Sequence, residues 1–167
     1  MTTSGERADL LESLTATRFF LRNTTQGLTD DQARERTTIS ELTLGGLIKH
    51  VSATEAQWAR FVVEGTSAQE MPEDFDWSER EREFTLLPDE TLEGVLAAYE
   101  QVAAATDELV RTVDLDLSHP LPAAPWFTPG ATRSARRVFV HIVAETAQHA
   151  GHADILREAI DGRKSMG

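Results

Sequence analysis

Apolar residues recur every three or four positions along most of this chain, which is the period of a helix with one buried face. Four long stretches follow the pattern, and each ends at a glycine or in a polar turn. These predicted helices cover Glu6–Asn23, Thr43–Glu64, Pro88–Val113 and Thr132–Ile160. A short turn of helix is also predicted from Thr29 to Arg36, because Thr29 follows the turn at Gly27 and is a good N-cap.

The inward faces of these helices are almost entirely apolar, with an occasional threonine. The first helix is expected to point Leu10, Leu14, Thr17 and Leu21 inward. Strand signals are nearly absent, since the apolar run from Phe84 to Leu87 is too short and isolated to build a sheet. The pattern therefore predicts an all-α four-helix bundle that forms a single domain over residues 1–167.

The connections between the first three helices are long, which favours crossover connections over simple antiparallel hairpins. The second of them, residues 65–87, is acidic and contains Phe75, Trp77 and Phe84. Two interpretations of this loop stay open: it covers a functional site, or it contacts a second subunit.

Charge and composition exclude several classes of function. The chain has 28 acidic and 16 basic side chains and a net charge of −12, so it repels nucleic-acid phosphates and anionic lipid surfaces. No apolar run has the length of a membrane span, and the N-terminus does not look like a secretory signal, so a cytoplasmic location is expected. Cysteine is absent, which excludes disulfides, thiolate metal sites and cysteine nucleophiles. Carboxylate and histidine chemistry remains.

His50 is the first residue that could carry such chemistry. It lies three positions after Leu47 and four before Thr54, so it shares the buried face of its helix or the margin of that face. A lone histidine there is more often a packed side chain than a ligand. The neighbouring Gly45-Gly46 pair lacks the context of a phosphate loop and is interpreted as close packing or as a helix N-terminus near a ligand.

The last helix contains Glu145 and His149, four residues apart and therefore on one face. That face is otherwise apolar, and burying these groups costs free energy unless they are paired or bound to a cation. A simple Glu–His helix pair is the plain alternative. His141 and His152 lie one turn away on either side and are candidate catalytic residues or supports of the site.

If the second and last helices are neighbours, His50, Glu145 and His149 could meet as three metal ligands. Three protein ligands with an open position are typical of catalytic zinc, and two histidines with one carboxylate also suit iron(II). Imidazole suits nickel and copper as well, so residue types alone do not choose the metal.

Other candidate binding residues flank the start of the last helix. Arg133, Arg136 and Arg137 form a small basic cluster that is either a solvated face or a clamp for an anionic substrate or cofactor. Trp126 and Phe127, in the proline-rich loop before it, either pack or form the wall of a pocket. No serine lies in a Gly-x-Ser-x-Gly context, so a serine hydrolase is not supported.

Two of these segments together resemble the DinB/YfiT-like superfamily. They are LIKHV at residues 47–51, with His50 inside it, and the run ETAQHAGHADILRE at residues 145–158. The second segment is similar to an actinobacterial branch of unknown function, and the arginine-rich, lysine-poor composition is typical of a GC-rich genome. Many relatives have histidine where this chain has Glu145. A glutamate there resembles the mycothiol-dependent maleylpyruvate isomerase branch.

The resemblance implies a DinB-like bundle with a divalent metal, most often zinc or nickel, on His50, Glu145 and His149. It also implies frequent homodimers and, in some members, transferase activity with a low-molecular-weight thiol such as mycothiol. A metal-dependent S-transferase or isomerase is thus the leading hypothesis. The alternatives are a metal-dependent hydrolase with His152 or His141 as its base, a non-catalytic metal-stabilised bundle that binds a small molecule, and a plain bundle without metal.

Overall fold

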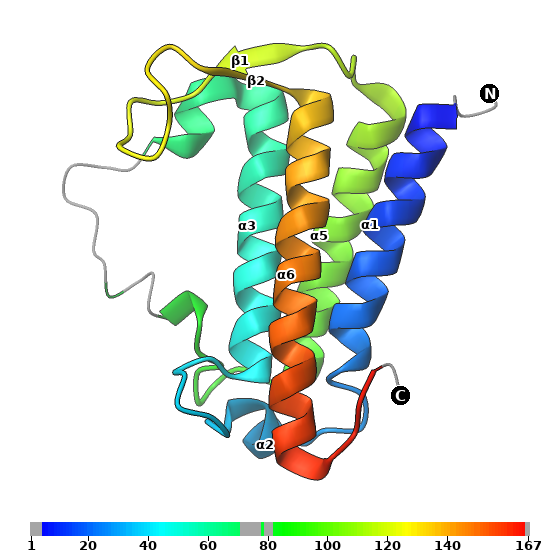
Figure 1. The fold of residues 1–167 in the computed structure, drawn as a ribbon, viewed down its shortest axis with the longest axis vertical. Helices are drawn as coiled ribbons and strands as arrows, with labels where there is room; N and C mark the ends of the chain where they lie inside the picture. Colours follow the sequence, from blue (N-terminus) through cyan, green and yellow to red (C-terminus); the bar gives the residue numbers. More distant parts are fainter. Residues whose placement is uncertain (1–4, 71–77, 79–81, 166–167) are drawn as a thin grey trace.

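The computed structural model describes residues 5–70, 78 and 82–165, and most of them are helical (Figure 1). Phe75 and Trp77 of the acidic loop lie outside the described residues. The elements in chain order are α1 (Gly5–Asn23), α2 (Asp30–Arg34), α3 (Leu44–Glu64), the 3-10 helix η1 (Gly65–Gln69), α5 (Leu92–Thr112), β1 (Ser118–Pro120), β2 (Thr132–Ser134) and α6 (Ala135–Asp161). The predicted all-α bundle is confirmed.

Side-chain caps fix where α3, α5 and α6 begin. The Thr43 side chain accepts a hydrogen bond from the backbone N–H of Gly46, as its predicted N-cap role requires. The predicted start of the next helix at Pro88 was wrong. Thr91 is the cap of α5, so the helix begins at Leu92. At the far end of α3, Gly65 has a φ of 74°, a left-handed value that ends the helix and that other residues rarely adopt.

The last helix also begins later than predicted, because Thr132–Ser134 is a strand. It pairs antiparallel with Ser118–Pro120, with His119 opposite Arg133. Ser134 then caps α6 by accepting from the backbone N–H of Arg137. Strands of three residues are too short to show an alternating pattern, so they could not be predicted from hydrophobic periodicity.

One long connection crosses the whole bundle. α3 runs from the lower end of the view to the upper end, and α5 starts again at the lower end, so the two helices are parallel (Figure 1). The segment after η1 must therefore return the length of the bundle, which confirms a crossover there. The connection that holds α2 instead stays at one end, so only one of the two long connections is a crossover of the bundle.

The two larger of three apolar clusters in the described core are separated by a buried ion pair, and the third cluster is Ala33, Leu86 and Leu92. One cluster includes Leu14 and Phe61, and the other includes Leu21 and Val51. Between them Arg18 donates from Nε and Nη2 to both carboxylate oxygens of Glu55, and both side chains are almost completely buried. Thr17, predicted to face inward, is only partly buried. Its hydroxyl donates to backbone carbonyls of its own helix, and Arg18 is the buried neighbour.

A membrane-spanning helix must be both long and apolar. None of the helices in the described part of the chain is both long and apolar enough to cross a bilayer.

Candidate metal centre

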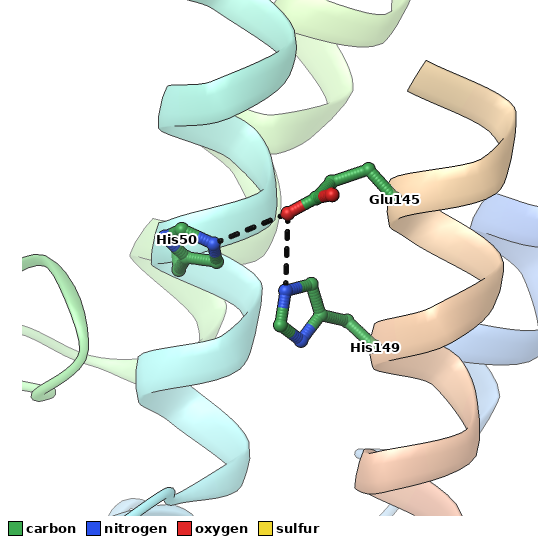
Figure 2. A group of neighbouring side chains, drawn as sticks. All are labelled: His50, Glu145 and His149. Carbon is green, nitrogen blue, oxygen red and sulfur yellow. Dashed lines mark hydrogen bonds and ion pairs between the residues drawn. The ribbon is translucent and has the colours of Figure 1, made fainter. Parts of the chain in front are cut away.

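Two packed helices bring the predicted ligands together. His50 lies in the second turn of α3, and Glu145 and His149 lie one turn apart on α6. α3 and α6 are neighbours in the bundle, and all three side chains point into the seam between them (Figure 2). Each residue offers a ligand atom, and these atoms all lie within 4.8 Å of one another. Among the described residues this is the group of histidines and acids that could hold a metal ion.

One carboxylate oxygen links the two imidazoles. Glu145 Oε1 lies 3.3 Å from His149 Nε2 and 3.6 Å from His50 Nε2. The two imidazole rings are nearly perpendicular, at 82°, with centroids 4.9 Å apart. His50 is almost fully buried, whereas Glu145 keeps about a quarter of its side chain exposed, 26 %. The group is therefore closed toward the core and open on one side.

The two histidines hold Glu145 in its charged form. Hydrogen bonding from His149, and then from His50, lowers the pKa of the Glu145 carboxyl well below its usual range. Partial burial acts in the opposite direction and is outweighed. An ionised carboxylate is the state that a metal ligand requires.

The donor set fits a divalent transition metal. Zinc, iron(II) and nickel all accept two imidazole nitrogens and one carboxylate oxygen as ligands. Calcium instead prefers a set made only of oxygen atoms, which this group does not provide. His50 Nδ1 is buried, and no acceptor in the described chain forms a hydrogen bond with it. His152 contacts one of the three residues, with its Nδ1 3.3 Å from His149 Nδ1.

A pocket of about 930 Å³ opens beside the group, and His50 and Glu145 contribute to its lining. One wall consists of α3 and η1 and carries amide and hydroxyl side chains, namely Thr54, Gln57, Thr66, Ser67 and Gln69. The loop between β1 and β2 forms another part of the lining and is mostly apolar, with Leu121, Trp126 and Phe127. The structure thus places Trp126 at a pocket wall, one of the two positions considered for it.

The two candidate catalytic histidines occupy different places. His141 lines the pocket, and its ring meets the Trp58 ring edge-on at 5.0 Å. Burial, followed by the positive charge of Arg133, lowers the pKa of His141. His141 is therefore neutral near pH 7 and able to accept a proton. His152 does not line the pocket in the described chain and instead contacts His149.

The arginine cluster divides into separate roles. Arg136 forms ion pairs with Glu6 and Asp116. The Arg133 guanidinium lies 4.4 Å from the centre of the Trp58 ring, so it supports a residue of the pocket without lining the pocket itself. Arg137 is exposed in the first turn of α6.

Sequence reasoning missed the polar wall and the aromatic cover of His50. The residues of η1 were assigned to a loop, and their only signal was the hydroxyl and amide composition after Gly65. Phe84 was recognised as an aromatic residue in the acidic connection, but nothing in its spacing relates it to His50. The structure stacks these two rings.

Comparison with known proteins identifies relatives of the whole domain. The sequence profile described as mycothiol-S-transferase matches residues 9–162. A crystal structure of a conserved protein from Enterococcus faecalis superposes with a TM-score of 0.65 at 14 % identity, covering 92 % of this chain and 96 % of that one. At this identity the likeness shows a shared fold. No curated protein matches the sequence.

Proposed function

The chain belongs to the mycothiol-S-transferase family of DinB-like proteins, and on this premise we propose that it is a metal-dependent enzyme that joins the thiol of mycothiol to a small electrophile. The family relates the chain to mycothiol. The reaction, the metal and the residue roles that follow are our proposal.

A single observation supports the proposal most strongly. The His50–Glu145–His149 group, which could hold a metal, borders a pocket of about 930 Å³. A purely structural metal is normally surrounded by protein ligands, whereas this group has three and is open toward a space large enough for two small substrates.

His50, Glu145 and His149 would hold the metal, with zinc or nickel the ions expected from the resemblance. When bound, such an ion supplies a Lewis acid that lowers the pKa of a coordinated thiol. Glu145 contributes the negative charge of the ligand set, and His152 orients His149 through their 3.3 Å contact.

His141 is the residue best placed to move the proton. Its ring is neutral near pH 7 and faces the same pocket as His50 and Glu145, so we assign it as the base that takes the thiol proton. The sulfur then forms a bond to the electrophilic carbon. In a substitution, the bond between that carbon and its leaving group breaks, and the leaving group departs with the electron pair. In an addition to an activated alkene, the π bond breaks, its electron pair moves to the neighbouring carbon, and that carbon takes the proton back from His141.

The two walls of the pocket suit two different substrates. Mycothiol carries many hydroxyl groups, and the amides and hydroxyls of the α3–η1 wall, including Gln57 and Ser67, provide partners for them. The apolar wall with Trp126 and Phe127 offers contact to an electrophile and excludes water from the reacting atoms. We do not assign Arg133 and Arg137 a direct contact with mycothiol. Arg133 acts through Trp58, which it covers.

A metal-dependent hydrolase is the second candidate function. It is supported by the same neutral His141, which could activate water as well as a thiol. The two functions differ in the nucleophile. A hydrolase uses water and turns over an ester or amide without any thiol, whereas the transferase requires mycothiol. A homodimer and a cytoplasmic location stay predictions.

A conjugation assay tests the proposal. Purified protein loaded with zinc or nickel is incubated with mycothiol and a panel of electrophiles, and thioether formation is measured by mass spectrometry. We expect metal-dependent turnover that is lost in His149→Ala and kept in Gln148→Ala, an exposed neighbour on the same helix. Turnover without metal, or no conjugation over the whole panel, contradicts the proposal.

A further inference from the structure

No hydrogen bond to Nδ1 fixes the ring plane of the His50 imidazole in the described part of the chain. Its Nε2 faces Glu145 Oε1 at 3.6 Å, and its Nδ1 is buried with no partner in the described chain. Metal-binding histidines nearly always donate this second N–H to a carboxylate, a carbonyl or water, which fixes the ring plane and the tautomer. Something else must hold the plane of this ring.

The side chain that contacts the face of His50 is Phe84. The two rings stack with centroids 4.0 Å apart and an angle of 21° between their planes. His149 meets the same imidazole at 82°, so the His50 ring is confined by one parallel and one perpendicular neighbour. A stacked ring restricts rotation about the bond that joins the imidazole to its Cβ, because rotation would drive the two rings into each other.

The segment that carries Phe84 is anchored to α3 by the residue next to His50. Lys49 Nζ donates to the backbone carbonyls of Arg82 and Thr85, at 3.0 and 2.8 Å, and to Glu90 Oε2 at 2.6 Å. Glu90 in turn accepts from the Leu87 backbone N–H at 2.8 Å. One lysine therefore holds both sides of Phe84 to the helix that presents His50.

A glycine on α3 makes room for this segment. A Cβ at position 46 would lie 1.8 Å from the Phe84 carbonyl oxygen, which is far inside any real contact. A Cβ at Gly45 would lie 3.0 Å from the Leu86 side chain. This explains the Gly45-Gly46 pair as close packing: the pair lets the backbone of residue 84 approach the helix one turn before His50.

We propose that Phe84 is a positioning residue for the metal site, whose stacked ring takes the place of the missing hydrogen bond and holds His50 Nε2 toward Glu145 and His149. This inference rests on the metal role of His50 in the proposed function. It adds a residue outside the ligand set, on a connection remote from α3 in sequence. It also assigns a role to Lys49 and Gly46, which keep Phe84 in place.

The test measures metal binding and not turnover. Zinc affinity is determined by competition with a chromophoric chelator for wild type, Phe84→Leu, Phe84→Tyr and Gly46→Ala. Gly151→Ala is the matched control, because a Cβ on that helical glycine meets nothing within 4 Å. Cobalt(II) absorption spectra of the same proteins report the geometry of the ligand set, and melting temperatures of the metal-free proteins report folding.

We expect Phe84→Leu to weaken zinc binding by about 10-fold or more, the size typical for loss of a group that orients a ligand. Gly46→Ala should weaken it similarly, whereas Phe84→Tyr, which keeps the flat ring, and Gly151→Ala should stay within about 3-fold of wild type. The cobalt spectrum should change in Phe84→Leu even though the protein remains folded.

Unchanged affinity and an unchanged cobalt spectrum in folded Phe84→Leu overturn the role of Phe84 and leave the proposed metal site intact. A wild-type chain that binds neither zinc nor cobalt overturns both. If affinity falls only in proportion to a lower melting temperature and the spectrum is that of wild type, Phe84 is a packing residue and the proposal is wrong.

Discussion

Glu145 Oε1 lies 3.3 Å from His149 Nε2 on its own helix and 3.6 Å from His50 Nε2 on α3, so a single oxygen ties two helices together. In a metal-free chain this carboxylate–imidazole contact crosses the seam of the bundle. With a metal, the same three side chains become ligands. The first two predictions concern what such buried pairs do for stability, and the later ones concern the pocket and the metal.

The Glu145 contact should make the metal-free protein more stable near neutral pH than in acid. The pKa of this carboxyl is lower in the folded chain than its ordinary value of 4.5, so below that pH the unfolded chain binds the proton more readily. The stabilisation is complete above pH 4.5 and is lost progressively as the pH falls further. Glu145→Gln should cost about 1 kcal/mol at pH 7, with allowance for partial exposure.

Urea unfolding of metal-free wild type and Glu145→Gln between pH 7 and pH 3 checks this prediction. The difference between the two proteins should shrink as the pH falls. A difference that stays constant with pH would show that the carboxylate charge contributes nothing to stability.

The Arg18–Glu55 pair should be essential for folding stability. Glu55 is 1 % exposed and occupies both Nε and Nη2 of Arg18, so Glu55→Ala leaves a charged guanidinium buried with only Asp107 as its remaining partner. We expect a loss of about 3–5 kcal/mol in the free energy of unfolding, measured by urea denaturation. The surface pair Arg60–Glu64 is the control, and Glu64→Ala should cost less than about 1 kcal/mol.

His141→Ala should separate metal binding from catalysis. His141 is not one of the three residues that could hold the metal, but it lines the same pocket. We expect the metal content to stay at the wild-type level and kcat for conjugation to fall by about 100-fold or more, as for loss of a general base. His141→Ala with full activity would remove the assigned base, and its loss of metal would show that His141 supports the ligand set.

Trp126→Ala should affect the binding of the electrophile and little else. The Trp126 side chain is 66 % exposed on the apolar wall of the pocket, so its removal costs the fold almost nothing. Steady-state kinetics should show a higher KM for the electrophile, with the KM for mycothiol and the melting temperature near wild type. A rise in the KM for mycothiol alone would place the thiol on this wall and reverse the two assignments.

The sequence predicted the helices and the ligand group because both depend on short-range spacing. The 3.6-residue period identifies the apolar faces, and the same period puts Glu145 and His149 on one side of α6. Placing His50 beside Glu145 and His149 required knowing that the second and last helices are neighbours. That information came from the family resemblance. The start of α5 at Leu92 was missed because both Pro88 and Thr91 are good helix-start signals and only the fold selects between them.

The rest depends on contacts between residues that are distant in the chain. Phe84 and His50 are brought together by Lys49 and Gly46, and no local pattern encodes that approach. Arg18 was not identified as buried, because an arginine in an amphipathic helix normally faces solvent and its partner Glu55 lies on another helix. The pocket likewise combines walls from α3, η1 and the β1–β2 loop, which the sequence shows only as separate segments.

Zinc titration by calorimetry, on protein purified without a histidine tag, tests the central claim most directly. Wild type should bind about one zinc ion per chain and melt at a higher temperature when loaded, because a ligand that binds only the folded state stabilises it. His50→Ala should lose both effects, and His119→Gln, which removes an imidazole outside the ligand group, should keep both. A wild-type chain that takes up neither zinc nor nickel, or a His50→Ala variant that binds zinc as wild type does, would contradict the account.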